Sequence, residues 1–250
     1  MSSLESRRIL VTGGSRGLGL AMVEAFVARK AKVTVLARDR GRLDALAARL
    51  PVSVVAGDIT DAALATRLVA DLRPDVLVLN AGASPAVGPI HEASWEAFSE
   101  AWNSDVRGAF HWVQAAMKVP LPAGSRVLLG SSGAAVQGSP LSGGYAGAKR
   151  MLWLMASYAN LAAQRAGIDI KFQAILPRQI IPETDLGRAA SEMYAQAKGI
   201  SLEAFSAGFG TPMPPARFAE HVVEILTDPK YAEGTAWGLK GDTGIQSLDA

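Results

Sequence analysis

The chain has 250 residues, of which 49% are hydrophobic and 19% are charged, and its formal net charge is +2. This length can bury the core of one large domain, and this composition excludes an intrinsically disordered chain. The charge is nearly balanced and forms no basic cluster with interleaved aromatic residues, so we expect no nucleic-acid partner.

Further absences in the sequence exclude other classes of protein. There is no cysteine, which excludes disulfide and thiolate chemistry. His91, His111 and His221 are far apart and lack metal-ligand spacing, so we predict no metal site. No apolar run is long enough to cross a bilayer, and the first residues lack the apolar core of a signal peptide. We therefore expect a cytoplasmic protein with no membrane partner.

Short apolar runs alternate with helical patterns along the chain. The runs are rich in Val, Ile and Leu, and they predict buried strands at 7–12, 31–37, 52–57, 74–80, 125–130 and 168–176. Helical periodicity predicts helices near 17–30, 41–50, 61–72, 94–118 and 143–166. This alternation is typical of a doubly wound parallel sheet with helices on both faces. No linker divides the chain, so we predict a single α/β domain over residues 1–250.

Two of the predicted helices carry long apolar faces. Between Trp95 and Met117, apolar residues recur in steps of three and four and mark one face of a helix. The helix after Tyr145 is apolar over much of its circumference. It could pack wholly within one subunit or also against a second one. We expect a homodimer or a homotetramer.

A glycine-rich turn, TGGSRGLG, follows the first predicted strand. Glycines let the backbone approach a pyrophosphate, whose charge is met by the N-terminus of the next helix. The position in a strand–helix–strand unit indicates a dinucleotide site, although Met22 holds the third glycine position of the usual fingerprint. The candidate cofactor-binding residues of this turn are Gly13, Ser15, Arg16, Gly17, Leu18 and Gly19.

The same turn also matches the GxSxG pattern of a hydrolase nucleophile elbow. An acid and His221 follow in the chain order of such enzymes. However, this elbow would lie on the first strand, with no earlier strand–helix loop to supply the second oxyanion donor. A hydrolase remains a minor alternative.

The end of the second predicted strand bears on the choice of cofactor. NAD-binding chains place Asp or Glu here to accept the ribose 2′-hydroxyl. Arg38 instead offers a guanidinium for a 2′-phosphate, and Arg16 could reach the same phosphate. The sequence therefore favours NADP(H) over NAD(H), although Asp39 could still turn inward.

Ser132, Tyr145 and Lys149 form the candidate catalytic set. Tyr145 and Lys149 are four residues apart near the start of a predicted helix, so they share one face. A free phenol titrates near pH ~10, and an ammonium one turn away favours the phenolate. Ser132, at the end of a predicted strand, could hold a carbonyl oxygen beside the phenol. These groups can move a proton but not a hydride, which requires a cofactor.

Together these motifs make the chain resemble a classical short-chain dehydrogenase/reductase over nearly its full length. The resemblance implies a Rossmann fold. Its further motifs are Asp58-Ile59 after the third strand, Asn80-Ala81-Gly82 after the fourth, and Pro177 after the sixth.

The resemblance also implies roles for the matching residues. Tyr145 would be the general acid/base, Ser132 rather than Ser131 would position the substrate oxygen, and Lys149 would favour the phenolate and bind the nicotinamide ribose. Asp58 and Ile59 would contact the adenine. The remaining cofactor-binding residues would be Asn80, Ala81, Gly82, Pro177 and Ile180.

The sequence departs from the family pattern at two places. Asp105 stands where the family has an asparagine that holds a water in a proton relay to the lysine. A carboxylate there would stabilise the lysine charge and offset its effect on Tyr145, so we expect activity with an altered pH profile. Arg178 replaces the glycine after Pro177, and Thr184 is displaced by two positions. Arg178 could meet an acidic substrate group or the cofactor phosphate, or be structural.

Residues 183–215, the predicted lid segment, stand where the family places its substrate lid. Met193, Tyr194, Phe205, Phe209 and Met213 could wall an apolar pocket or bury the segment against the body. The sequence thus predicts an NADP(H)-dependent oxidoreductase that interconverts a moderately apolar carbonyl and a secondary alcohol. The alternatives are a 3-oxoacyl-carrier-protein reductase-like enzyme and a catalytically impaired nucleotide-sensing binding protein.

Overall fold

The computed structural model describes residues 3–84, 88–119 and 121–249. Its centre is one eight-stranded sheet in the order β3-β2-β1-β4-β5-β6-β7-β8. All neighbouring strands are parallel except β7 and β8, which are antiparallel. The strands are β1 (Arg8–Thr12), β2 (Lys32–Ala37), β3 (Ser53–Ala56), β4 (Val76–Leu79), β5 (Ser125–Gly130), β6 (Ile170–Pro177), β7 (Ala236–Lys240) and β8 (Gly244–Ser247).

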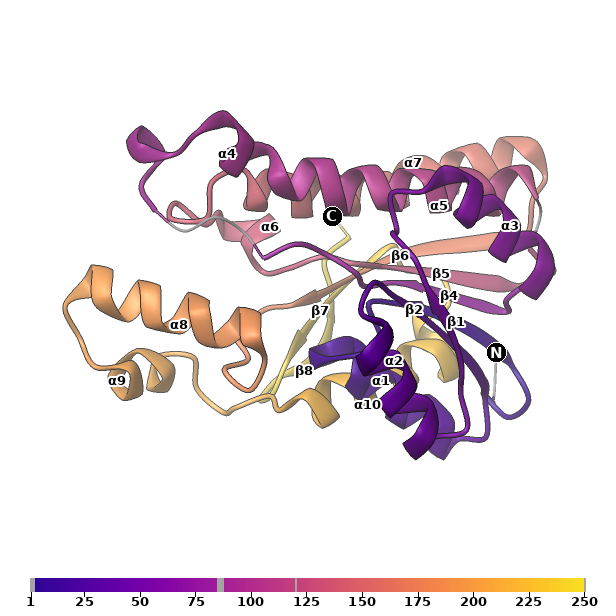
Figure 1. Cartoon of the computed structure of the whole chain (residues 1–250), viewed down its shortest axis with the longest axis horizontal. Helices are drawn as coiled ribbons and strands as arrows, with labels where there is room; N and C mark the ends of the chain where they lie inside the picture. The colour runs from indigo at the N-terminus through magenta and orange to yellow at the C-terminus, as the bar shows by residue number, and fades with distance from the viewer. Residues whose placement is uncertain (1–2, 85–87, 120, 250) are drawn as a thin grey trace.

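Helices cover both faces of this sheet (Figure 1). The helices α1 (Gly17–Ala28), α2 (Arg40–Arg49) and α10 (Pro215–Thr227) lie on one face, and α3 (Ala62–Leu72), α5 (Arg107–Lys118) and α7 (Tyr145–Ala166) lie on the other. The helices α4 (Trp95–Ala101), α6 (Ala134–Gln137), α8 (Asp185–Lys198) and α9 (Leu202–Ala207) gather beyond one end of the sheet, on the left of Figure 1. Two short 3₁₀ turns occupy Ile90–Glu92 and Pro229–Tyr231.

Each face of the sheet has its own apolar core. Phe26 and Phe218 are buried on the side of α1 and α10, and Trp112 and Phe172 are buried on the side of α5 and α7. All four residues of β4 are buried, because helices cover this strand on both sides. This is the predicted doubly wound α/β architecture, with the order of strands reversing between β1 and β4.

The fold differs from the sequence prediction in the carboxyl-terminal region. The six predicted strands correspond to β1–β6 and include neither β7 nor β8. The β8 strand turns back beside β7 through residues 241–243, and the two form an antiparallel hairpin at that edge of the sheet. A four-residue strand, half of which is exposed, carries little of the apolar signal that marked the buried strands.

The predicted helix over 94–118 is interrupted by one π-helical turn, Trp102–Val106. The face that the apolar spacing marked is largely exposed at Trp95, Trp102 and Phe110. Of that face, α5 buries Val113, and the other large side chain that it buries is Trp112. Within the described part of the chain, no helix has both the length and the apolar character of a membrane span.

Candidate active site

The glycine-rich turn after β1 lies at the point where the strand order reverses. Gly13 has φ +68°, and a Cβ added to it would lie 2.7 Å from the Cα of Ala81. The Thr12 hydroxyl accepts hydrogen bonds from the backbone N–H groups of Asn80 (3.1 Å) and Ala81 (3.2 Å). The Asn80 side chain donates to the carbonyl of Gly13 at 3.3 Å. The turn and the 80–82 segment therefore form one packed unit, in which Thr12 is an organising residue that the sequence analysis did not single out.

This turn has the features of a phosphate site. Among the described residues, no side chain caps the N-terminus of α1, and its first turn holds no acidic residue. Gly17 has φ +55°. Gly19 packs so closely on the carbonyl of Gly13 that a Cβ would collide with it. Free N–H groups at the start of a twelve-residue helix favour an anion, so these residues fit a dinucleotide pyrophosphate.

The carboxylates after β2 and β3 are held by local hydrogen bonds. Asp39 caps α2: its carboxylate accepts the backbone N–H of Arg42 at 3.0 Å and lies 3.3 Å from the Arg42 Nε. Asp58 accepts hydrogen bonds from the backbone and hydroxyl of Thr60, both at 2.8 Å. These hydrogen bonds, together with the charge of Arg38, lower the pKa of Asp58. Arg38 is thus close enough to Asp58 for its charge to help lower the pKa of that carboxyl, while Asp39 is engaged by its own helix.

Ile59 lies against α5. A Cβ added to Gly108 would lie 2.7 Å from its Cδ1 atom, and its carbonyl accepts the Trp112 indole N–H at 3.0 Å. Packing on α5 therefore fixes the position of the loop in which Asp58 and Ile59 lie.

Two adjacent serines at the end of β5 have different surroundings. The Ser131 hydroxyl is buried and donates to the carbonyl of Lys149 at 2.7 Å, which ties β5 to α7. Ser132 is partly buried, and its hydroxyl accepts the backbone N–H of Ala134 at 3.3 Å. A hydroxyl that accepts this bond keeps its own proton available to a substrate oxygen.

Tyr145 and Lys149 lie one turn apart at the start of α7, and both are buried. The Lys149 Nζ lies 5.4 Å from the centre of the Tyr145 ring. It donates to the carbonyl of Gly130 at 3.2 Å and lies 2.9 Å from the Asp105 Oδ2. The candidate base, the lysine and the end of β5 are thus brought together.

Asp105 forms a buried ion pair with Lys149. Burial opposes the charge of Lys149, but the Asp105 carboxylate, the Tyr145 oxygen and the hydrogen bond to Asp105 outweigh it, so the pKa of Lys149 is raised. The other carboxylate oxygen of Asp105 accepts the N–H of Ala83 at 2.8 Å and the hydroxyl of Ser104 at 2.6 Å. Asp105 therefore links Lys149 to the loop that follows β4.

The π-helical turn Trp102–Val106 carries Asp105. Turns of this kind insert one residue into a helix and often occur at functional sites. Gly82 packs directly on the carboxylate, since an added Cβ would lie 2.6 Å from the Asp105 Oδ2. The aspartate noted in the sequence is therefore enclosed on all sides by the predicted site.

The segment after β6 holds the other departure from the family pattern. The carbonyl of Pro177 accepts the N–H of Gly133 at 2.8 Å. Arg178 crosses Gly238 of β7, and its guanidinium donates to the Gln246 side chain of β8 at 3.4 Å. Of the roles that the sequence left open for Arg178, this contact fits the structural one. Ile180 is partly buried in the same connection.

Helix α8 begins beside the glycine-rich turn. The hydroxyl of the displaced Thr184 caps α8 by accepting the N–H of Gly187 at 3.0 Å. A Cβ added to Gly17 would lie 3.7 Å from the methyl group of Thr184. Arg16 and Asp185 form an ion pair across this contact, with 2.9 Å between Nη1 and Oδ2. The start of the predicted lid segment therefore lies on the predicted phosphate site.

The far part of α8 contacts the loop before Tyr145. The Tyr194 hydroxyl lies 2.8 Å from that of Ser139, which lies 2.5 Å from that of Ser142. The Tyr194 ring stacks on Phe205 of α9 at 6.1 Å between ring centres. Met213 instead belongs to the core beside α10, so it does not wall a pocket.

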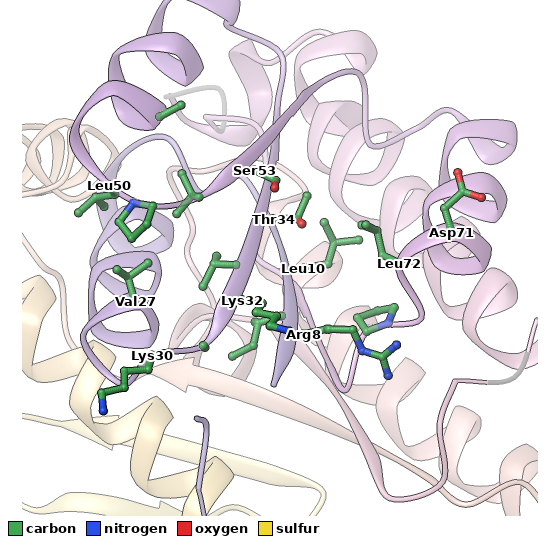
Figure 2. Close-up of a pocket in the computed structure, with 17 residues that line it drawn as sticks. Arg8, Leu10, Val27, Lys30, Lys32, Thr34, Leu50, Ser53, Asp71 and Leu72 are labelled. Carbon is green, nitrogen blue, oxygen red and sulfur yellow. The ribbon is translucent and has the colours of Figure 1, made fainter. Parts of the chain in front are cut away.

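Neither His221 nor the hollow in Figure 2 adds to this site. His221 is buried in α10, and its Nε2 atom lies 3.3 Å from the carbonyl oxygen of Lys240. The hydrolase alternative requires a histidine hydrogen-bonded to Ser15, and this ring nitrogen contacts the end of β7 instead. A hollow of about 850 Å³ lies at the amino ends of the strands, beside Arg8, Lys32 and Ser53, which begin β1, β2 and β3 (Figure 2). None of the predicted site residues lines this hollow.

Comparison with known proteins identifies the same family. Residues 7–195 match the family model described as short chain dehydrogenase. The chain is 32% identical over 248 residues to the 3-oxoacyl-(acyl-carrier-protein) reductase MabA of Mycobacterium avium, covering 96% of this chain and 91% of the relative. It is 28% identical over 254 residues to 2-(S)-hydroxypropyl-CoM dehydrogenase 3 of Xanthobacter autotrophicus, covering 95% and 96%.

Solved structures show the same fold. An actinorhodin polyketide ketoreductase with NADPH has a TM-score of 0.79 and 22% identity, with 96% of this chain and 98% of that chain covered. A short chain dehydrogenase/reductase from Burkholderia phymatum in complex with NAD has a TM-score of 0.75 and 19% identity, with 92% and 89% covered. The chain therefore belongs to the short chain dehydrogenase family of oxidoreductases.

Proposed function

We propose that the protein interconverts a carbonyl compound and a secondary alcohol with NADP(H). The observation that carries this proposal is the cluster of Tyr145 and Lys149 on one face of α7, beside Ser132 at the end of β5. A bound nicotinamide would exchange the hydride with the substrate carbon. The glycine-rich turn and the N-terminus of α1 would hold the pyrophosphate, and residues 80–82 would lie along the cofactor.

In this mechanism the protein side chains handle the proton. The Ser132 hydroxyl donates to the substrate oxygen and holds it beside the phenol. Tyr145 gives its proton to that oxygen during reduction and removes it during oxidation. The ammonium of Lys149 stabilises the phenolate form electrostatically. Asp105 keeps Lys149 charged and in place through the 2.9 Å ion pair, and at the same time offsets part of its charge.

The preference for NADP(H) rests on the residues after β2. The guanidinium of Arg38 is exposed and available to a 2′-phosphate. Asp39 would be the acceptor for a ribose 2′-hydroxyl, but its carboxylate caps α2 and forms an ion pair with Arg42. Related structures hold NAD, NADPH or NADH, so the family as a whole accepts either dinucleotide.

A titration with NADPH and NADH, followed by energy transfer from tryptophan to the nicotinamide, tests the cofactor assignment. NADPH should bind more tightly, and Arg38→Ala should weaken NADPH binding by about tenfold while leaving NADH binding nearly unchanged. Arg40→Ala is the matched control, because Arg40 pairs with Asp44 within α2 at 2.9 Å. Tighter binding of NADH would overturn the assignment.

Turnover distinguishes an enzyme from a nucleotide sensor. Tyr145→Phe should reduce reduction of a carbonyl substrate by about a hundredfold or more and leave NADPH binding intact. Carbonyls attached to an acyl carrier are a second substrate class, favoured by the relative from Mycobacterium avium. Absence of turnover with both free and carrier-linked carbonyls, despite tight NADPH binding, would favour the sensor.

We also propose that the protein assembles as a homo-oligomer through α5 and α7. These helices expose large apolar side chains to water, among them Phe110 on α5 and Tyr158 and Leu161 on α7. Burying such side chains against the same surface of a second copy would remove apolar area from water.

A further inference from the structure

The ion pair between Arg16 and Asp185 connects the glycine-rich turn to the first turn of α8. The Nη1 and Oδ2 atoms are 2.9 Å apart, while the two side chains remain 52% and 69% exposed. Arg16 is therefore held by a carboxylate of the predicted lid segment at the place where a dinucleotide would bind. An exposed ion pair contributes little stability, so exchange of the partner costs little.

We propose that Asp185 is a cofactor-selectivity residue, which competes with the 2′-phosphate of NADP(H) for the guanidinium of Arg16. This inference rests on the proposed function. A phosphate can form a bidentate, charge-assisted pair with Arg16 and thereby displace the carboxylate. NAD(H) carries a hydroxyl at this position and leaves the ion pair intact. Asp185 thus lowers the affinity for NADP(H) and leaves the affinity for NAD(H) unchanged. The ratio of the two affinities is therefore smaller than Arg38 alone would make it.

The exchange also has a consequence for α8. Asp185 lies in the first turn of this helix, next to the Thr184 cap, so its pairing with Arg16 holds the amino-terminal end of α8 against the turn. The contact of Tyr194 with Ser139 holds the far part of the same helix. NADP(H) should therefore loosen the start of α8 and leave its far part in place, whereas NAD(H) should loosen neither.

The first test is a pair of dissociation constants for the full-length protein at low ionic strength. Asp185→Asn should tighten NADPH binding by about twofold to fivefold and leave NADH binding unchanged, and high salt should remove the difference. Glu183→Gln, an exposed carboxylate two positions earlier, is the matched control and should change neither constant. In an Arg16→Ala background, Asp185→Asn should have a smaller effect on NADPH.

The second test is hydrogen exchange of the backbone amides of α8. Saturation with NADPH should increase exchange in the first turn of the helix relative to saturation with NADH, and Arg16→Ala should abolish this difference. Equal effects of Asp185→Asn on both dinucleotides, or weaker NADPH binding, would overturn the inference while the proposed function stands. Failure of the unmodified protein to bind either dinucleotide would instead overturn the proposed function.

Discussion

At the scale of single residues, Asp105 is the feature that most alters the expected chemistry. It stands at the position of the family's asparagine and pairs with Lys149 at 2.9 Å. The carboxylate favours the ammonium form of Lys149, which explains why the pKa of this buried lysine is raised although burial alone would lower it. In the proposed mechanism, its negative charge would also reduce the electrostatic support that Lys149 gives to a phenolate at Tyr145.

Asp105→Asn should retain activity with a displaced pH profile. Without the carboxylate, the ammonium acts on Tyr145 with less compensation, so the phenolate forms more readily. The ascending limb of kcat/KM for alcohol oxidation, on which the catalytic base loses its proton, should therefore move to lower pH. Stopped-flow or steady-state rates across the neutral and alkaline range measure this shift. Asp44→Asn, on exposed α2, is the control; a profile of Asp105→Asn that superimposes on the unmodified one would contradict the role given to Asp105.

The same ion pair should be visible in stability. Lys149→Met leaves the Asp105 carboxylate buried without its cation, and we expect a loss of about 3–5 kcal/mol in the free energy of unfolding. Replacing both residues, as Lys149→Met with Asp105→Leu, should recover most of this loss. Urea denaturation measures the three proteins; a double variant no more stable than Lys149→Met would contradict the pairing.

The pH dependence of this stabilisation follows from the sign of the shift. Folding raises the pKa of Lys149 above its ordinary value of 10.5, so the pair stabilises the protein fully below that value. The contribution is lost as the pH rises through the folded-state pKa. The difference in stability between the unmodified protein and the double variant should therefore be constant near neutrality and change only in strong alkali.

At the scale of elements, the six apolar runs and the helices α1, α2, α3, α5 and α7 could be predicted because each signal is local, whereas α8 and α10 were not among the predicted helices. The interruption at Trp102–Val106 could not be predicted, since the apolar spacing through this stretch is compatible with a continuous helix. The pairing of Asp105 with Lys149 joins α7 to that interruption, and the pairing of Arg16 with Asp185 joins residues 169 positions apart. Contacts of this kind depend on how elements pack, which no local pattern records.

The attachment of α8 to the loop before Tyr145 gives a prediction at this scale. Tyr194→Phe removes the hydroxyl that contacts Ser139 but keeps the ring that stacks on Phe205. We expect local opening of α8 to become easier by about 1 kcal/mol, which would appear as faster hydrogen exchange in α8 with unchanged global stability. Tyr158→Phe, on the exposed side of α7, is the control and should leave exchange in α8 unchanged.

At the scale of the whole molecule, the carboxyl ends and the amino ends of the strands have different surroundings. The glycine-rich turn, residues 80–82, Ser132 and Tyr145 all follow the carboxyl ends of strands, where parallel sheets of this type bind their ligands. The hollow of Figure 2 lies at the amino ends of the strands. The helices α5 and α7 cover a face of the sheet rather than either end of its strands. A second copy could therefore cover their outer surface without obstructing the proposed site.

The last prediction concerns that surface. Phe110 of α5 and Tyr158 and Leu161 of α7 are 47%, 59% and 48% exposed in a single chain. Contact between these helices and those of a second copy would exclude the three side chains from water. A double variant, Phe110→Glu with Leu161→Glu, should place charges in such an interface and shift the protein to a monomer in sedimentation velocity. Leu202→Glu, on exposed α9, should leave the assembly unchanged. An unmodified protein that sediments as a monomer at all concentrations would show that these side chains face water, and that the proposed site is complete within one chain.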